Sequence, residues 1–359
     1  METAAFDYEL PPERIAQTPI AYRDHARLLL DGGVGGTPVD AIVADLPHLL
    51  APGDVVVVND TRVIPARLRL QRPTGGKAEV LLLSPTAVPG TWEALVRPSR
   101  SLLPGAKLRV PGEDADLFEV GEDLGEGRRL VRLLAPAPES TTGIVADAHQ
   151  SLGADPMLRV AEAVGEMPLP PYITARLADA DRYQTVYARV AGSAAAPTAG
   201  LHLTDGVLAG LKARGIPVLR VELRVGLGTF RPITAAHIED HRMHHEHYVV
   251  APEVMSACET ANRVVAIGTT TLRALEAAAA TGELAGRTDL FIREPYPFGV
   301  VDLLLTNFHL PKSSLLVLID AFVGARWRDL YQWALTHDYR FLSFGDAMLL
   351  DRTGSGVRP

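Results

Sequence analysis

Acid–base side chains are concentrated between residues 239 and 248. This segment holds three carboxylates and four imidazoles: Glu239, Asp240, His241, His244, His245, Glu246 and His247. Imidazole titrates near neutral pH, so such a group suits proton transfer or substrate binding. Imidazoles and carboxylates also bind zinc or iron, although the H-E-x-x-H spacing is absent. The third interpretation is that these side chains form a solvated polar edge without a chemical role, because residues 248–250 have the pattern of a strand.

Two further segments place polar side chains among small or apolar neighbours. The segment AAAPTAGLHL contains Thr198 and His202, and the segment LTNFHLP contains Asn307 and His309. The second segment lies at the end of an expected strand, and α/β proteins bind ligands beyond the carboxyl ends of their strands. Both segments are therefore candidate sites.

Glycine-containing turns after expected strands are the other binding candidates. The expected strand at 263–267 is followed by Gly268, three threonines and an expected helix at 270–281 that carries Arg273. Free backbone N–H groups at a helix N-terminus bind phosphate or carboxylate, and plain threonine capping is the alternative. The turn GLGTF, which contains Thr229, is either a loop that faces a ligand or an ordinary turn.

Composition excludes several classes of protein. The chain has 359 residues, a length typical of two domains, and its single cysteine, Cys258, excludes an internal disulfide framework. Cys258 lies in a helical pattern and no G-x-S-x-G motif is present, so covalent nucleophilic catalysis lacks support. The longest apolar run, at 315–323, contains Asp320 and is too short to cross a bilayer. No targeting segment is visible, and we expect a cytoplasmic protein.

The charge is distributed unevenly along the chain. Residues 61–110 contain nine basic and two acidic residues, a net charge of +7, whereas the whole chain carries −8 and the remainder therefore −15. Such asymmetry is typical of a surface that faces phosphate. A basic face without a partner, or one docked onto the acidic remainder, is the alternative.

The periodicity changes where the charge changes. Short apolar runs separated by turns predict a small antiparallel sheet or barrel at 61–138, with a hairpin or loop at 111–127. Strands and helices alternate elsewhere, including an expected strand at 289–292, which favours an α/β layer or barrel. We therefore expect a discontinuous α/β domain of residues 1–60 and 139–359 with a small β domain inserted.

Specific motifs run from end to end of the chain. They are FDYELP at 6–11, NDTRVIPAR at 59–67, WEALVRP at 92–98, MPLPPYI at 167–173, RYQTVYA at 182–188, AAPTAGLH at 195–202, TNFHLP at 306–311 and YRF at 339–341. In these motifs the chain closely resembles the S-adenosylmethionine:tRNA ribosyltransferase-isomerase family of queuosine biosynthesis. The resemblance implies a distorted α/β barrel with an inserted small antiparallel β-barrel domain.

The resemblance also implies a reaction. The ribosyl group of S-adenosylmethionine is transferred to 7-aminomethyl-7-deazaguanine in tRNA and isomerised, which gives epoxyqueuosine-tRNA and releases adenine and methionine. S-adenosylmethionine is then the ribosyl donor, and neither a cofactor nor a metal is expected. A general base removes a proton next to the sulfonium, and an acid assists the departure of adenine.

Residue roles follow from the same resemblance. The acid–base candidates, among which the general base is not distinguished, are His202, His241, His244 and Glu246. The expected contacts to S-adenosylmethionine are Thr198, Thr229, Thr269, Arg273, Asn307 and His309. The expected contacts to tRNA are Arg62, Arg67, Arg69, Arg72, Lys77, Arg97 and Arg100. We expect a monomer, and a homodimer stays open.

Some positions depart from the family pattern. Leu203 stands where phenylalanine is usual, Arg224 where histidine is common, and residues 293–295 replace a Tyr-Pro-Gly-like stretch. A paralogue with the same chemistry on a small-molecule acceptor is therefore an alternative. A non-catalytic RNA-binding protein is a further one, which the intact acid–base motifs disfavour.

Overall fold

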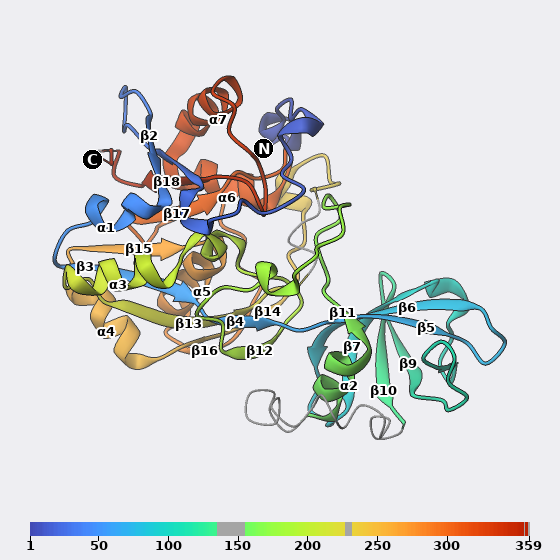
Figure 1. Ribbon diagram of the computed structural model, residues 1–359. Coiled ribbons are helices and arrows are strands. Elements are labelled where there is room, and N and C mark those ends of the chain that lie inside the picture. Colours follow the sequence, from blue (N-terminus) through green and yellow to red (C-terminus); the bar gives the residue numbers. More distant parts are fainter. Residues whose placement is uncertain (135–154, 227–231, 355, 358–359) are drawn as a thin grey trace. The chain divides into compact units, whose positions relative to one another are not determined.

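The described residues form two compact units. The computed structural model describes residues 1–134, 155–226, 232–354 and 356–357. The larger unit comprises Met1–Asp60, Pro170–Ala188 and Pro197–Pro359, and the smaller comprises Thr61–Leu169 and Arg189–Ala196. Figure 1 shows the two groups of elements in the colours of the sequence.

A nine-stranded sheet, in the order β16-β14-β13-β3-β15-β17-β18-β1-β2, forms the centre of the larger unit. Its strands are β1 (Arg27–Leu30), β2 (Val39–Ile42), β3 (Asp54–Asn59), β13 (Val218–Arg224), β14 (Glu246–Val250), β15 (Arg263–Ile267), β16 (Ala285–Thr288), β17 (Leu303–Asn307) and β18 (Ala347–Asp351). β3 runs parallel to β13 and β15, and β15 runs parallel to β17. The outer strands include antiparallel pairs, so the larger unit is a mixed α/β structure.

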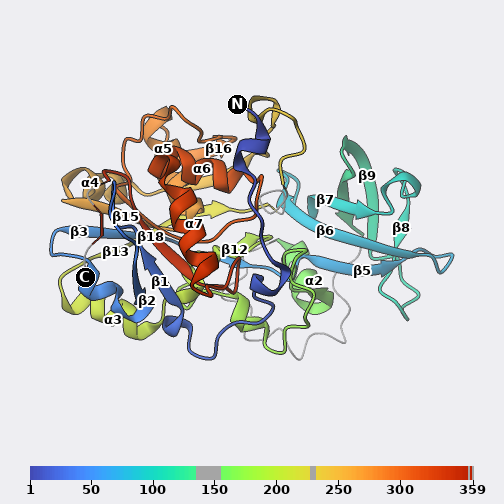
Figure 2. The same ribbon diagram turned by 90° about the horizontal axis from the view of Figure 1, so that it is seen from above.

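Helices cover this sheet on both faces (Figures 1 and 2). They are α1 (Leu46–Leu49), α3 (Asp205–Ala213), α4 (Pro252–Thr260), α5 (Thr269–Thr281), α6 (Ser314–Val323) and α7 (Trp327–Thr336). Every residue of β3 is buried, as expected for a central strand with both faces covered. α5 packs against β3, β13, β14, β15 and β17, and α6 packs against β18.

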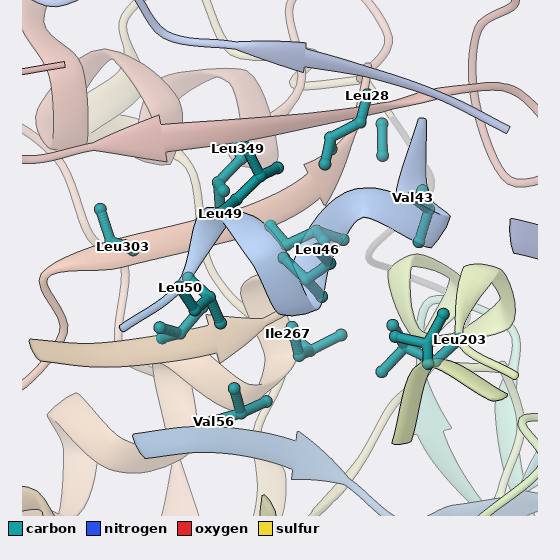
Figure 3. Close-up of a cluster of buried hydrophobic side chains, with 14 of the residues drawn as sticks. Leu28, Val43, Leu46, Leu49, Leu50, Val56, Leu203, Ile267, Leu303 and Leu349 are labelled. Atoms are coloured by element: carbon teal, nitrogen blue, oxygen red, sulfur yellow. The ribbon is translucent and has the colours of Figure 1, made fainter. Parts of the chain in front are cut away.

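The hydrophobic core lies between the sheet and α1 and α3. Alternate strand residues such as Val56, Ile267 and Leu349 point to this face, because side chains of a strand alternate between its two faces. Leu46 of α1 and Leu211 of α3 pack against them. Figure 3 shows the strand and α1 side chains meeting in this cluster.

The smaller unit is built from a seven-stranded antiparallel sheet in the order β11-β5-β6-β7-β10-β9-β8. Its strands are β5 (Arg67–Gln71), β6 (Lys77–Pro85), β7 (Thr91–Arg97), β8 (Lys107–Leu108), β9 (Phe118–Gly125), β10 (Arg128–Leu133) and β11 (Gly165–Glu166). Gln71 at the end of β5 and Arg109 just beyond β8 exchange two backbone hydrogen bonds, at 2.9 and 2.8 Å. Backbone pairing therefore continues from β8 back to β5.

The boundary of the smaller unit differs from the expected end at residue 138. Its later residues include α2 (Pro156–Val164) and β12 (Val190–Ser193). β12 pairs with β4 (Thr61–Val63), β11 pairs with β5, and α2 packs against β5. These pairings join segments about 100 residues apart, and periodicity within one segment carries no information about them.

One expected local structure is wrong and another is confirmed. Residues 289–292 form no strand, and the strand just before them is the more polar β16, whose backbone pairs with β14. The segment 111–127, expected to be a hairpin or loop, supplies one arm of a hairpin, because β9 pairs antiparallel with the following strand β10.

In the part of the chain that the structure describes, no helix is long and apolar enough to cross a membrane.

Replacing Leu349 by alanine tests the central core. This side chain is fully buried, so Leu349→Ala should lower the free energy of unfolding by about 2–5 kcal/mol through lost burial and a cavity. The control is Val249→Ala on β14, where the side chain is 43% exposed and the expected change is within about 0.5 kcal/mol. Urea unfolding measures both, and equal losses in the two variants would contradict the described packing.

Candidate active site

The parallel strands bring the polar motifs of the larger unit to one edge of the sheet. β15 ends at Ile267 and the neighbouring β17 ends at Asn307. Gly268 follows β15 with a φ of +88°, a backbone conformation that favours glycine, and α5 starts directly after it. The 3₁₀ helix Thr198–His202 contacts β17. Three motifs that are far apart in the sequence therefore meet here.

Asn307 connects two of these motifs through its side chain. Thr198 Oγ1 donates a hydrogen bond to Asn307 Oδ1 at 3.2 Å, and Asn307 Nδ2 lies 2.9 Å from His202 Nε2. Asn307 Nδ2 also donates to the carbonyl oxygen of Asp346 at 3.4 Å, which assigns this atom as the amide nitrogen. The amide therefore donates and His202 Nε2 accepts. The proton of the neutral imidazole is then on Nδ1.

His202 is neutral at physiological pH. Its side chain is buried, and burial lowers its pKa from 6.5 to about 4, with further lowering by the cationic side chains of Arg23 and Arg340. Because Nε2 of the neutral ring accepts a hydrogen bond from Asn307, the Nδ1–H group is the ring's hydrogen-bond donor. His202 is therefore prepared to donate a hydrogen bond, and it accepts a proton at Nε2 only if Asn307 moves away.

Packing fixes the turn that carries His202. A Cβ on Gly200 would lie 2.0 Å from Tyr187 Oη, so only glycine fits at this position. Arg23 Nη1 donates to the carbonyl oxygen of Leu201 at 3.4 Å. The imidazole is thus held by its neighbours in the chain as well as by Asn307.

A buried ion pair occupies a second part of this edge. Arg273 in α5 contacts Glu246 at the start of β14, and both side chains are less than 5% exposed. Gly226 N donates to Glu246 Oε1 at 3.4 Å, so the carboxylate also contacts the residue just beyond β13. Removing either charged partner would leave the other buried without its counterion.

Unused hydrogen-bond donors lie beside this ion pair. Arg273 Nη2 and Thr270 Oγ1 are buried and have no hydrogen-bond partner among the described residues. Thr269 and Thr270 belong to the first turn of α5, where backbone N–H groups and the helix dipole favour an anion. These groups suit a ligand carboxylate, since buried donors in native proteins normally find an acceptor.

The histidines between residues 241 and 245 are less enclosed. This segment has no regular structure and enters β14 at Glu246, so its histidines share no helical face. His241 is half-buried with its ring 5.6 Å from that of Phe291, and burial, followed by the nearby His244, lowers its pKa. His244 itself is exposed. Thr229 lies outside the described residues.

His309 follows Asn307 by two residues and is also buried. Its Nε2 is 3.1 Å from Thr306 Oγ1, and its backbone N–H donates to Tyr331 Oη at 2.9 Å. Burial lowers the pKa of His309 to about 3. The side chain is thus enclosed and neutral.

The expected RNA-binding residues lie in the smaller unit and are partly neutralised. Arg69, Lys77 and Arg97 are exposed on β5, β6 and β7. Arg69 pairs with Glu166 at 2.8 Å, and Arg97 reaches Glu79 at 4.0 Å. The other four are Arg62 and Arg67, which are half-buried, Arg72, which contacts Ser101, and Arg100, which is exposed. Contact with RNA stays a prediction for all seven.

Two buried carboxylates near the candidate site were missed from the sequence. Asp60 is 1% exposed, directly follows β3 and lies 3.8 Å from Arg220. Its position after a buried strand was the signal that pointed to it. Asp346 accepts the backbone N–H groups of Arg27 and Arg340, at 2.9 and 2.8 Å. Arg340 lies six residues before Asp346, but Arg27 comes from a distant segment that no local pattern connects to it.

In the ranges that the structure describes, no three histidine, cysteine or acidic side chains are placed to share a metal ion. The larger unit is thus a mixed α/β protein whose acid–base and anion-binding groups meet where its parallel strands end.

Comparison with known proteins identifies the family. The family model described as queuosine biosynthesis protein matches residues 3–350. The chain is 47% identical to the S-adenosylmethionine:tRNA ribosyltransferase-isomerase of Rubrobacter xylanophilus over the full length of both proteins. It is 46% identical to the protein of the same name from Thermus thermophilus, covering 96% of this chain and 98% of that relative. The chain therefore belongs to the queuosine biosynthesis protein family.

A solved structure agrees with this assignment. The crystal structure of S-adenosylmethionine tRNA ribosyltransferase from Thermotoga maritima matches with a TM-score of 0.51 and 32% sequence identity. The match covers 96% of this chain and 99% of that one. The mixed α/β fold is therefore shared with a member of the family.

Asn307→Asp tests the contact with His202. A carboxylate beside Nε2 favours the imidazolium, so the pKa of His202 should rise from about 4 to roughly 6. NMR titration of the ring measures the pKa, and long-range ¹H–¹⁵N spectra of the wild-type protein should show Nδ1 protonated. Asn307→Ala is the control, because it adds no charge and should leave the pKa low. An unchanged pKa in the aspartate variant would contradict the assigned contact.

The buried neutral histidines predict how stability depends on pH. His309 has a folded-state pKa of about 3, below its unfolded value near 6.5, so the unfolded chain binds more protons below pH 6.5. The free energy of unfolding should therefore fall as the pH drops from 6.5 toward 4, by about 1.4 kcal/mol per pH unit for each such histidine. In His309→Gln this slope should be smaller by that amount. Urea unfolding at several pH values measures it, with exposed His245→Gln expected to keep the wild-type slope.

Proposed function

We propose that this protein is an S-adenosylmethionine-dependent tRNA ribosyltransferase-isomerase. It transfers the ribosyl group of S-adenosylmethionine to 7-aminomethyl-7-deazaguanine in tRNA and isomerises it, with release of adenine and methionine and formation of epoxyqueuosine-tRNA. The observation that carries the proposal is full-length identity of 47% to a relative of that name. The buried acid–base and anion-binding groups at the strand ends supply a site for it.

The N-terminus of α5 holds the donor substrate in this proposal. S-adenosylmethionine carries an amino-acid carboxylate. Thr270 Oγ1 and Arg273 Nη2, buried donors with no partner among the described residues, would donate hydrogen bonds to it together with the first-turn backbone N–H groups. Thr269 lies at the start of the same helix. The role of Glu246 is to hold the guanidinium of Arg273 in place, through the ion pair and the bond from Gly226.

His202 assists the departure of adenine. Adenine leaves as an anion unless a donor or acid meets its ring nitrogens, and neutral His202 keeps a proton on Nδ1. Asn307 and Thr198 orient this ring and are positioning residues. The base that removes the proton next to the sulfonium is then one of the more accessible His241 and His244, whose rings have no amide partner among the described residues.

The smaller unit contacts the tRNA, and the fold is a distorted α/β barrel with an inserted small β-barrel. Exposed Arg69, Lys77 and Arg97 support the RNA contact, since cations on one surface attract phosphate. The Gln71–Arg109 backbone pairing supports the small barrel. The protein acts without a metal or a cofactor and as a monomer.

The paralogue alternative rests on the departures from the family pattern. Leu203 is fully buried in the hydrophobic core, so this departure changes packing and leaves the polar groups of the site in place. Arg293 is part-exposed and pairs with Glu239 at 3.4 Å. Neither observation favours another acceptor over tRNA.

The reaction itself provides the test. The protein is incubated with S-adenosylmethionine and tRNA that carries 7-aminomethyl-7-deazaguanine, and adenine, methionine and epoxyqueuosine are measured by liquid chromatography and mass spectrometry. All three products should appear. Folded protein that forms none of them would overturn the proposal, and adenine release with the free deazapurine alone would favour the paralogue.

His202→Ala tests the proposed donor. Loss of a general acid or donor should lower the rate of adenine release about 10²–10⁴-fold. Circular dichroism checks that the variant folds, and equilibrium binding of S-adenosylmethionine should change much less than the rate. His245→Ala, at an exposed position in the neighbouring segment, is the matched control and should keep the wild-type rate. Full adenine release by His202→Ala would remove His202 from the mechanism.

A further inference from the structure

A groove of about 710 Å³ lies on the smaller unit, outside the candidate active site. It is lined by Arg69, Leu70, Lys77, Ala78, Glu79, Arg97, Pro98 and Pro111. These residues come from β5, β6, the end of β7 and the segment after β8, so four separate parts of the small sheet build one depression. Its volume is within the range of pockets that enclose small organic ligands.

The strand register explains how the charged residues reach one surface. Arg69 is paired with Glu79 across β5 and β6, and Glu79 is paired with Arg97 across β6 and β7. Lys77 lies two residues before Glu79 and therefore on the same face of β6. The groove thus presents three cations and one carboxylate. Lys77 has no ion-pair partner among the described residues.

The existing ion pairs hold these cations weakly. The Arg69 side chain is 65% exposed and its partner Glu166 52%, while the Arg97 side chain is 74% exposed and 4.0 Å from Glu79. Exposed pairs of this kind contribute little to stability. Both guanidinium groups are therefore available to turn toward phosphate at little cost.

The floor of the groove is apolar. Pro98 and Pro111 are exposed there and contribute ring surfaces without a hydrogen-bond donor, whereas Leu70 and Ala78 alternate to the buried face of their strands. A flat base suits such a floor, and arginine guanidinium planes stack on unpaired bases. An RNA double helix hides its bases. An unpaired stretch of RNA therefore fits the prolines and arginines of the groove, and a double helix does not.

We infer that this groove binds an unpaired stretch of the RNA substrate, with bases against Pro98 and Pro111 and phosphates on Arg69, Lys77 and Arg97. The inference rests on the proposed function, which supplies RNA as the partner. It adds where on the smaller unit the single-stranded part is held. Of the seven basic residues expected from the sequence, Arg69, Lys77 and Arg97 line the groove.

Charge reversal in the groove tests the inference. Full-length Arg69→Glu/Arg97→Glu is compared with wild type for binding of a fluorescein-labelled RNA hairpin with an unpaired loop, by fluorescence anisotropy at several salt concentrations. The Kd should rise at least about tenfold at 0.1 M salt, and the slope of log K against log salt should fall by about 1.4, equivalent to two single-strand phosphate contacts. Lys77→Glu alone should give a smaller change in the same direction.

A matched control removes the effect of net charge. Arg132 is 59% exposed on β10 of the same unit and, like Arg69, pairs with a glutamate. Arg132→Glu should change the Kd less than about threefold. Equal weakening by Arg132→Glu and by a single groove reversal, Arg97→Glu, would overturn the inference.

Two further measurements show which kind of partner the groove binds and whether a negative result concerns the groove or the proposed function. A fully paired RNA without a loop should bind more weakly than the hairpin, and an acidic peptide that displaces the hairpin equally well would overturn the choice of RNA. Binding of S-adenosylmethionine should be the same in all variants, because the site in the larger unit is unaltered. If wild type binds the hairpin but forms no product from modified tRNA, the proposed function fails while the groove stands.

Discussion

The ends of the parallel strands are the constraint on which the site depends. β3, β13, β15 and β17 lie side by side and run in one direction, so the loops that follow them emerge at one edge. The backbone N–H groups that begin α5 and the side chain of Asn307 meet there for this reason. The buried valines of β3 hold the strands in register, because both of its faces are covered by the core.

Burial then sets the chemistry of the groups at this edge. His202 is kept neutral by its enclosure and by two nearby cations, and the amide of Asn307 selects the ring nitrogen that carries its proton. Arg273 lies in the same interior, where it forms an ion pair with Glu246. One edge thus combines a neutral hydrogen-bond donor with a cationic anion site, which suits a substrate that holds both a carboxylate and a purine leaving group.

The two units differ in how far their polar side chains are buried and paired. In the larger unit His202, Glu246 and Arg273 are buried and contact other polar groups, whereas in the smaller one Arg69 and Arg97 are exposed and weakly paired. Exposed, screened charge supports reversible attraction to a long polyanion. Buried, preorganised groups support chemistry on a small molecule, because they need no rearrangement as charge develops.

The sequence by itself determined the family, the central strand and helix segments and most of the site motifs. These are local properties: apolar runs, turn residues and motifs whose spacing lies within one segment. The tertiary structure decided that Asn307 contacts His202, that Glu246 pairs with Arg273, and that the backbone of His309 contacts Tyr331. It also decided the extent of the smaller unit and the role of the polar strand β16. Each of these depends on backbone pairing or side-chain contact between segments distant in the chain, and no pattern within one segment encodes its partner.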